Sequence, residues 1–309
     1  MISTTNTPRT LIQWGADRFE RAGLVFAHGT DNALDEAACL VLHALQIGYD
    51  QPDAVLDRQI TGADRQRVLH LLEQRITSRK PAAYLLNEAW FAGMSFYVDE
   101  RVLVPRSPIA ELIEAQFTPW IHPERVGRVL DMCTGSGCIG IACAQMFPDA
   151  TVDLSDLSSD ALDVAQENIG RHQLMDRVTA VHSDIFTALQ GRVYDIIVAN
   201  PPYVPEEEMQ QLPAEFGHEP SLGLQAGTDG LDIIAQILKQ AAGHHADNGI
   251  LVAEVGHSQD YLLACYPEVP FIWLDFEYGG SGVFLLDKAQ LEACQPQFDQ
   301  VASKRVESG

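Results

Sequence analysis

The sequence predicts an α/β fold: a mainly parallel sheet with an antiparallel last strand, preceded by a small N-terminal helical domain. Three observations predict it. From residue 126 onward, short apolar runs alternate with segments of helical periodicity, as parallel strands joined by crossover helices require. Before residue 80, apolar residues recur at helical spacing. Near the end of the chain, two apolar runs stand too close together for a crossover helix between them.

The expected strands of the sheet are short and rich in β-branched residues. They cover Val126–Leu130, Thr151–Leu154, Val178–Val181, Tyr194–Ala199 and Ile250–Val255, with helices expected at 138–147, 159–172 and 229–243. The last two runs, Phe271–Phe276 and Gly282–Leu286, should pair antiparallel, because only Glu277–Ser281 separates them. Beyond Asp287 the sequence is polar, and we expect residues 291–309 to form a loosely held tail.

The N-terminal part predicts a separate helical domain, residues 1–88. Apolar spacing indicates helices over 9–27, 35–47 and 64–77, punctuated by glycines. Between Trp90 and Val104, aromatic and β-branched residues flank Asp99-Glu100, which indicates a β-hairpin linker over 89–104. The α/β domain then spans 105–290.

The 309-residue chain carries a net charge of −23, and this charge is unevenly placed. Residues 1–90 contribute −2 and residues 91–309 contribute −21. A domain this acidic repels phosphate backbones, so a basic protein partner is expected and direct recognition of nucleic acid is not. Acidity that serves only solubility is the simpler alternative. Because the helical domain is nearly balanced in charge and has no chemical motif, we expect it to recognise the substrate.

Other site classes have little support in the sequence. The six cysteines form no C-x-x-C pair and have no histidine at zinc-like spacing, so neither a metal nor a disulfide framework is expected. No apolar run reaches the roughly 18 residues that a membrane span needs. The polar start, Met1–Arg9, does not have the layout of a secretory signal. We expect a cytoplasmic protein with no membrane partner.

A glycine-rich turn marks a candidate cofactor site. Residues Val129–Gly140 read as a strand, a tight turn and the start of a helix, in which Gly135 and Gly137 let the backbone approach a ligand closely. Asp131, at the end of the strand, can accept a hydrogen bond from the amino acid part of a cofactor. The run also fits G-x-G-x-x-G, so a nicotinamide-dependent dehydrogenase remains a competing interpretation.

Two more aspartates end neighbouring strands. Asp156 can accept both ribose hydroxyls of a nicotinamide or a methionine cofactor, and a helix N-cap is its simpler explanation. Asp184 can accept from an exocyclic adenine amine while Ile185 packs on the ring, although an ordinary loop aspartate is also possible.

The decisive segment is Asn200-Pro201-Pro202-Tyr203, directly after an apolar strand, where ligands bind in open α/β sheets. An amide nitrogen is a poor nucleophile because its lone pair is delocalised into the carbonyl. The Asn200 side-chain oxygen and the Pro201 carbonyl can accept both N–H bonds of such a group and favour the developing positive charge. Pro202 fixes the backbone. Tyr203 offers a ring face to a planar amide, a role in which its hydroxyl is not needed.

Taken together, these segments resemble the HemK-type protein glutamine N5-methyltransferases over nearly the whole chain. The resemblance also includes Val104-Pro105-Arg106, His218-Glu219-Pro220, Gly227–Leu231 and Glu254-Val255-Gly256. It implies a Rossmann-like class I methyltransferase fold and S-adenosylmethionine as cofactor. One branch of the family modifies release factors, and the other modifies protein three of the large ribosomal subunit. The run Asp131-Met132-Cys133-Thr134-Gly135-Ser136-Gly137-Cys138 resembles the second branch, whereas the first usually has glycine in place of Cys133.

By this resemblance, residues from two sets form the site. The cofactor set is Asp131, Thr134, Gly135, Ser136, Gly137, Asp156, Asp184, Ile185 and Asn200, and the glutamine set is Asn200, Pro201, Pro202 and Tyr203 with Phe96 and Arg106 from the hairpin side. Asn200, Pro201 and Tyr203 are the expected catalytic residues. Release-factor methylation, adenine-N6 methylation of nucleic acid and a non-catalytic ribosome-assembly role are the alternatives.

Overall fold

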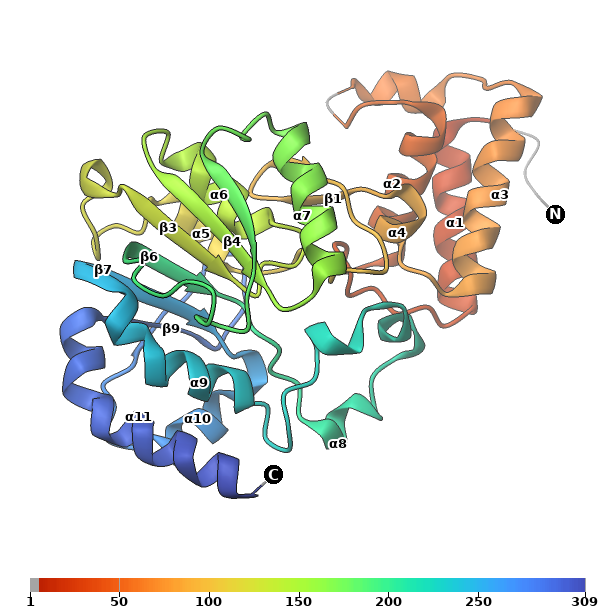
Figure 1. Ribbon diagram of the computed structural model, residues 1–309. Coiled ribbons are helices and arrows are strands. Elements are labelled where there is room, and N and C mark those ends of the chain that lie inside the picture. Colours follow the sequence, from red (N-terminus) through yellow and green to blue (C-terminus); the bar gives the residue numbers. More distant parts are fainter. Residues whose placement is uncertain (1–5, 50, 309) are drawn as a thin grey trace. The chain divides into compact units, whose positions relative to one another are not determined.

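The computed structural model describes residues 6–49 and 51–308, the side chains of 306–308 excepted. The chain divides into two compact units (Figure 1). Unit 1 contains residues up to Ala89, together with Val98–Glu100 and Pro213–His218. Unit 2 contains Trp90–Tyr97, Arg101–Leu212 and the chain from Glu219 onward.

Unit 1 is built from the three expected helices and one more. These are α1 (Pro8–Arg21), α2 (Ala33–Leu45), α3 (Gly62–Ser78) and the short α4 (Ala82–Leu86). Each of the first three begins at a side chain that accepts a hydrogen bond from its first turn, and these N-caps are Thr7, Asn32 and Thr61. Their apolar faces meet in a core that includes the fully buried Phe19, Leu40 and Leu72. The three predicted helices are confirmed: each begins one or two residues earlier than predicted, α1 ends at Arg21 rather than near residue 27, and α3 extends to Ser78.

Unit 2 is a seven-stranded sheet between two layers of helices. Its strands are β3 (Arg128–Met132), β4 (Thr151–Asp156), β5 (Val178–His182), β6 (Tyr194–Ala199), β7 (His245–Glu254), β8 (Ile272–Trp273) and β9 (Val283–Asp287). They are ordered β5-β4-β3-β6-β7-β9-β8. The first five are parallel, and β9 pairs antiparallel with both β7 and β8, as predicted.

The two helical layers bury alternate residues of the same strands. Val129, Ile196 and Val252 face a core shared with α5 (Ile109–Glu114), α6 (Cys138–Met146) and α7 (Ser159–Arg171). Leu130, Ile197 and Leu251 face the other core, under α9 (Asp232–Ala241), α10 (Gln259–Cys265) and α11 (Lys288–Ser308) (Figure 1). Burial on both faces explains why the strands read as continuous apolar runs. A further four-residue helix, α8, covers Glu206–Met209.

The β-hairpin differs from the prediction in position. Its strands are β1 (Ala89–Phe91) and β2 (Met94–Phe96), and the turn is Ala92-Gly93, both with positive φ, rather than Asp99-Glu100. A two-residue turn of this kind matches the twist of paired strands. Beyond β2 the backbone leaves strand conformation, so the valines at 98, 102 and 104 are buried without forming a ladder.

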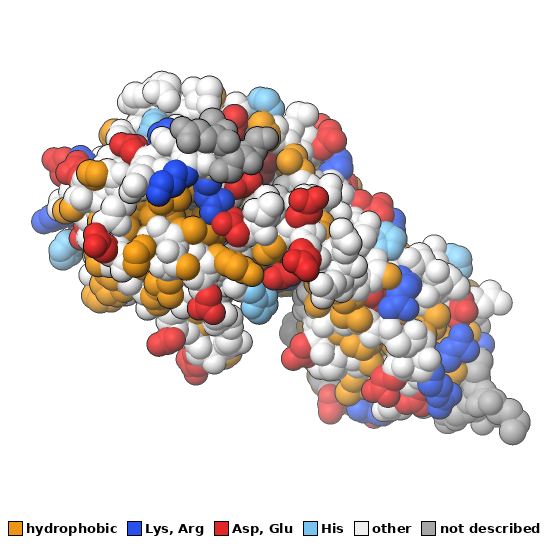
Figure 2. All heavy atoms as spheres, turned by 90° about the horizontal axis from the view of Figure 1, so that it is seen from below, with side chains coloured by type: hydrophobic (Ala, Val, Ile, Leu, Met, Phe, Trp, Pro, Cys, Tyr) orange, Lys and Arg blue, Asp and Glu red, His pale blue; other side chains and the backbone are white. Residues whose placement is uncertain are grey.

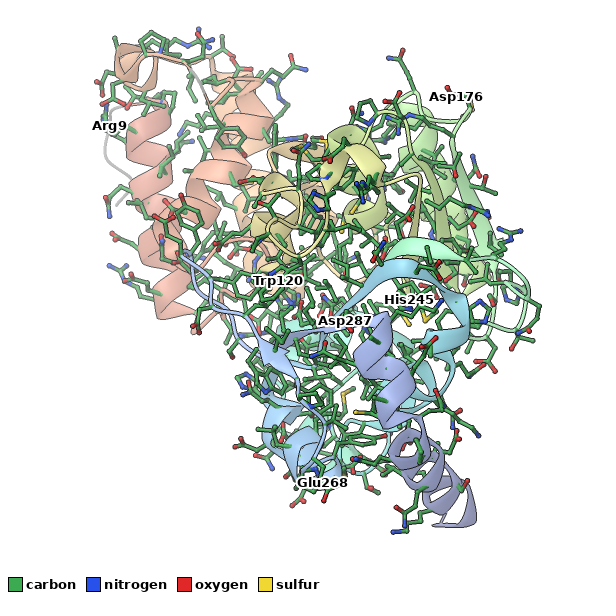
Figure 3. All side chains as sticks on the ribbon, turned by 90° about the vertical axis from the view of Figure 1, so that its left-hand side faces the viewer. Arg9, Trp120, Asp176, His245, Glu268 and Asp287 are labelled. Atoms are coloured by element: carbon green, nitrogen blue, oxygen red, sulfur yellow. The ribbon has the colours of Figure 1, made fainter. Side chains whose placement is uncertain are left out.

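The predicted loose tail is wrong. Asp287, labelled in Figure 3, ends β9, and α11 begins at the next residue. This helix buries one side of each turn: Leu291, Cys294 and Phe298 lie in the second core, and Ala302 is buried as well. The spacing of these four residues is helical, but the polar residues around them dominated the sequence pattern.

On the face drawn in Figure 2, the helical unit shows both basic and acidic side chains, as its near-balanced composition requires. In the part of the chain that the structure describes, no helix is long and apolar enough to cross a membrane.

Candidate active site

The sheet brings the glycine loop and the Asn-Pro-Pro-Tyr segment to one place. Strands β3 and β6 are parallel neighbours, and their register pairs Met132 with Ala199. Chain order reverses between them, since β4 and β5 lie on the far side of β3. The residues that follow, from Cys133 and from Asn200, therefore leave adjacent strand ends at the switch point where α/β sheets bind ligands. The sequence placed each segment at the carboxyl end of a strand, and the structure makes those two strands neighbours.

The glycine loop is held from within by Asp131. One oxygen of its carboxylate, Oδ2, accepts from the Thr134 hydroxyl at 2.5 Å and from the Gly140 backbone N–H at 2.8 Å. The other, Oδ1, is buried without a hydrogen-bond partner among the described residues. Burial raises the pKa of Asp131 to about 7. The side chain thus sets the conformation of the loop and retains one unmet acceptor beside it.

The glycines of the loop fill two different needs. A side chain at Gly135, where φ is +54°, would meet no atom within 4 Å, so the backbone there borders open space. At Gly140, a Cβ would lie 2.1 Å from Leu154 and 2.8 Å from the Asp131 Cβ, so this glycine lets the helix pack closely on the strands. Open backbone followed by close packing is the division of roles found in nucleotide-binding glycine loops.

Asp156 ends β4 and faces the same loop. Its Oδ2 accepts from the Gly135 N–H at 2.9 Å and its Oδ1 from the Ser158 N–H at 2.9 Å. Burial raises the pKa of Asp156 above its ordinary value, against the effect of these backbone donors. Each carboxylate oxygen keeps further acceptor capacity, so ribose binding by Asp156 stays a prediction.

Asp184 and Ile185 follow β5 in an unusual backbone conformation. Asp184 is exposed, and Ile185 is partly buried with φ +49°, a left-handed conformation that a β-branched residue rarely adopts. The Ser183 hydroxyl holds this turn by donating to the Ile185 carbonyl at 2.8 Å. Backbone strain of this kind is found at binding sites, where the surrounding structure stabilises it. Adenine binding by this pair stays a prediction.

Asn200 leaves β6 with its side chain uncommitted. Its amide makes no hydrogen bond within the described residues, although Asn200 is only partly exposed. Pro201 is buried, and Pro202 and Tyr203 are partly buried. The Tyr203 hydroxyl donates to the buried carboxylate of Glu254 at 3.0 Å, a contact that the sequence did not indicate.

The two hairpin-side residues have structural partners. Phe96 has no exposed surface and packs on His172, with ring centroids 4.8 Å apart, so the prediction that it lines the substrate site is wrong. Arg106 forms a two-point ion pair with the buried Glu219, and its contact with substrate stays a prediction.

Sequence reasoning missed Asn168, which connects the hairpin to the glycine loop. Its side chain exchanges two hydrogen bonds with the Tyr97 backbone and donates to the Ser136 carbonyl at 2.8 Å. A single asparagine inside a helical pattern carries no signal for these distant contacts. Within residues 6–49 and 51–308, no group of three His, Cys, Asp or Glu side chains is arranged to hold a metal ion.

Comparisons with known proteins agree with this arrangement. The model of the methyltransferase small domain matches residues 116–219, which include the glycine loop and Asn200–Tyr203. A ribosomal protein uL3 glutamine methyltransferase from Xanthomonas campestris pv. campestris is 49% identical, covering 96% of each chain. Proteins of the same name from Francisella tularensis subsp. tularensis and Bordetella pertussis are 44% and 46% identical, covering 98% and 92% of this chain and 97% and 96% of theirs. Since such identity extends over nearly the full length, the chain belongs to the ribosomal protein uL3 glutamine methyltransferase family.

Proposed function

We propose that this protein transfers a methyl group from S-adenosylmethionine to the side-chain amide nitrogen, N5, of a glutamine in ribosomal protein uL3. The observation that carries the proposal is the register of β3 and β6, which brings the open glycine loop beside the uncommitted Asn200 amide. Three relatives that bear this activity in their names support it. We infer that the protein works in the cytoplasm, where ribosomes are built.

The residues around the glycine loop fit the cofactor. Open backbone at Gly135 accepts close approach, Asp156 supplies a carboxylate for paired ribose hydroxyls, and Asp184 with Ile185 supplies an acceptor and an apolar surface for adenine. The unmet Oδ1 acceptor of Asp131 suits an ammonium group. Thr134, Ser136 and Gly137 complete the loop. When bound, S-adenosylmethionine supplies an electrophilic methyl group on a sulfonium.

Asn200 and Pro201 would act on the acceptor amide. The Asn200 side-chain oxygen and the Pro201 carbonyl each accept one N–H of the glutamine, which orients the nitrogen and withdraws it from water. As positive charge grows on that nitrogen, both hydrogen bonds strengthen, so the interaction favours the transition state over the ground state. The buried Pro201 and the adjoining Pro202 keep these acceptors rigid.

Tyr203 and the helical unit would supply orientation and recognition. The Tyr203 ring offers an apolar face to the planar amide. We assign substrate recognition to residues 1–88, whose charge is nearly balanced, and steering of a basic partner to the acidic remainder. Association with uL3 should then slow as salt concentration rises.

Mass spectrometry of purified uL3 tests the proposal. Incubation with this protein and S-adenosylmethionine should add one methyl group to one glutamine, and peptide-chain release factor serves as the alternative acceptor. Methylation of the release factor with uL3 unmodified would assign the chain to the other substrate. The absence of a methyl group on either protein would contradict glutamine methylation.

A further inference from the structure

Glu254 lies at the end of β7 with a buried carboxylate that receives two hydroxyl donors. The Tyr203 hydroxyl donates to its Oε1 at 3.0 Å. The Ser107 hydroxyl donates to its Oε2 at 2.6 Å and also accepts from the Ile109 backbone N–H at 3.3 Å. Glu254 therefore joins Tyr203 of the acceptor segment to the start of α5, although the three residues are far apart in the sequence.

The rest of Tyr203 is enclosed by glycines and one serine. A Cβ on Gly256 would lie 2.6 Å from the Tyr203 ring, and a Cβ on Gly230 would lie 2.1 Å from the Tyr203 carbonyl oxygen. The Ser258 hydroxyl donates to that same oxygen at 2.8 Å. Backbone and ring are thus positioned by close packing, and the hydrogen bond to Glu254 fixes the far end of the ring.

The groups around the Glu254 carboxylate hold it in place as the hydrogen-bond acceptor of Tyr203. Ser107 and Tyr203 donate to Glu254, and Arg106 is the cation whose charge acts on it. Burial raises the pKa of Glu254 despite these partners. Burial raises the pKa of Tyr203 as well, so the phenol keeps its proton and remains the donor. A buried carboxylate that accepts from the Tyr203 hydroxyl holds the ring more rigidly than a hydrogen bond to water would.

We propose that Glu254 is a positioning residue for methyl transfer, which acts through the Tyr203 hydroxyl to orient the ring against the substrate amide. The inference rests on the proposed function and adds a residue that touches neither substrate nor cofactor. The inference also changes the role of the Tyr203 hydroxyl. The sequence predicted a ring-face contact for which the hydroxyl is not needed, whereas the hydrogen bond to Glu254 gives the hydroxyl the task of orienting the ring.

Two single variants and their combination test this. Glu254→Gln keeps the shape and one acceptor oxygen but removes the charge, and Tyr203→Phe keeps the ring but removes the donor. Each should lower kcat by about tenfold, the loss expected when a hydrogen bond to a charged group is weakened in the transition state. Their KM for the cofactor should stay unchanged, since neither residue is among those assigned to the cofactor.

The double variant gives the decisive comparison. If Glu254 acts through the Tyr203 hydroxyl, the variant that combines Glu254→Gln with Tyr203→Phe should have the same kcat as the less active of the two single variants. Tyr194→Phe is the matched control, because the Tyr194 hydroxyl donates to the Asp153 carboxylate at 2.7 Å at the opposite end of β6. Tyr194→Phe should lower the unfolding temperature by about as much as Tyr203→Phe does, and it should leave kcat unchanged.

The outcomes separate the two proposals. Non-additive losses in kcat, with the control fully active, support positioning by Glu254. Losses that multiply in the double variant, or a Tyr203→Phe variant with wild-type kcat, overturn it while the proposed function stands. A wild-type chain that transfers no methyl group to uL3 overturns the proposed function itself.

Discussion

Glu219 accepts the Arg106 guanidinium at two points, with 2.8 Å between Oε1 and Nη1 and 2.6 Å between Oε2 and Nη2. The glutamate side chain has no exposed surface, whereas 31% of the Arg106 side chain is exposed. The Val104 backbone N–H also donates to Glu219, at 3.0 Å. This carboxylate therefore fixes the segment that follows the hairpin to the loop that returns from the acceptor motif.

Arg106→Ala should lower the free energy of unfolding by about 3 kcal/mol, because it removes the two-point ion pair to the buried Glu219 carboxylate. Arg106→Lys should lose less, since an ammonium replaces the charge but not the two-point geometry. Urea unfolding followed by circular dichroism measures both. Arg125→Ala, at an exposed arginine, is the control and should change stability by less than about 0.5 kcal/mol. Equal stability of the two alanine variants would contradict this role.

A second buried glutamate stabilises unit 1. Glu215 accepts from the Val25 backbone N–H at 3.1 Å and pairs with Arg79 at 2.7 Å, and Arg75 lies 3.7 Å away. Burial acts to raise the pKa of Glu215, but the backbone donors and Arg79 outweigh it, so the pKa is lowered. Its contribution to stability is present at neutral pH and is lost as pH falls through the lowered pKa.

Glu215→Ala should lower the unfolding free energy by about 3 kcal/mol, because it removes the carboxylate that lies beside both the buried Arg75 and the partly exposed Arg79. Glu73→Ala removes a surface partner of Arg18 at 3.2 Å, where both side chains are at least 40% exposed, and should lower it by less than about 1 kcal/mol. Chemical denaturation of the two variants at pH 7 and about pH 4 gives the comparison. The loss of unfolding free energy in Glu215→Ala should come closer to the loss in Glu73→Ala at the lower pH, because Glu215 then begins to gain a proton in the wild-type protein.

The fold was largely predictable because its signals are local. Strands buried on both faces appear as apolar runs, and Tyr194–Ala199 was predicted with its observed bounds. Parallel pairing then places the residues after each strand at one edge, so the candidate site followed from positions such as Asp131, Asp156 and Asn200. The glycine turn predicted a cofactor loop but left a nicotinamide cofactor open, and only the family resemblance indicated S-adenosylmethionine.

What the sequence left out depends on distant partners. Glu219 lies in a loop and Glu254 at the end of β7. Their partners, Arg106 and Ser107 respectively, are each more than 100 residues away in the sequence. No periodicity reports such a pair. The helix α11 was missed for another reason, since its apolar residues form a narrow stripe among polar ones. The hairpin was misplaced because the buried valines beyond β2 have strand-like composition without strand pairing.

Asp131 predicts a pH dependence of stability. Burial raises its pKa from 3.8 to about 7, so between these values the folded protein keeps a proton that the unfolded chain has released. Stability from this group therefore falls as pH rises through that window and is constant above it. Asp131→Asn keeps an oxygen that can accept from Thr134 and Gly140 and removes the titration.

Between about pH 4 and about pH 8, the unfolding temperature of Asp131→Asn should rise relative to that of the wild type, because only the wild type loses stability from this titration. Differential scanning fluorimetry without cofactor measures it, and Asp149→Asn, at an exposed aspartate, serves as the control. A difference that is constant with pH would show that Asp131 does not titrate in this window.

Asn200 gives the sharpest prediction for the reaction. Its amide is free of partners within the described chain, so its replacement breaks no contact that holds the fold. Asn200→Ala should lower kcat by roughly 10²–10³-fold, as the loss of one preorganised hydrogen-bond partner of a charged transition state does in other enzymes. Stability and cofactor affinity should change little by comparison, which calorimetry with S-adenosylhomocysteine would measure.

Asn200→Asp separates hydrogen bonding from charge at the same position. A carboxylate still accepts from the substrate amide, and it brings a negative charge whose desolvation is costly, so we expect partial activity between wild type and the alanine variant. Single-turnover transfer of labelled methyl to uL3 isolates the chemical step. If Asn200→Ala turns over at nearly the wild-type rate, the segment after β6 serves as a turn, and the acceptor chemistry assigned to it fails. If both variants are equally slow, an acceptor oxygen at this position is not enough for turnover, which would contradict a role based on hydrogen-bond acceptance alone.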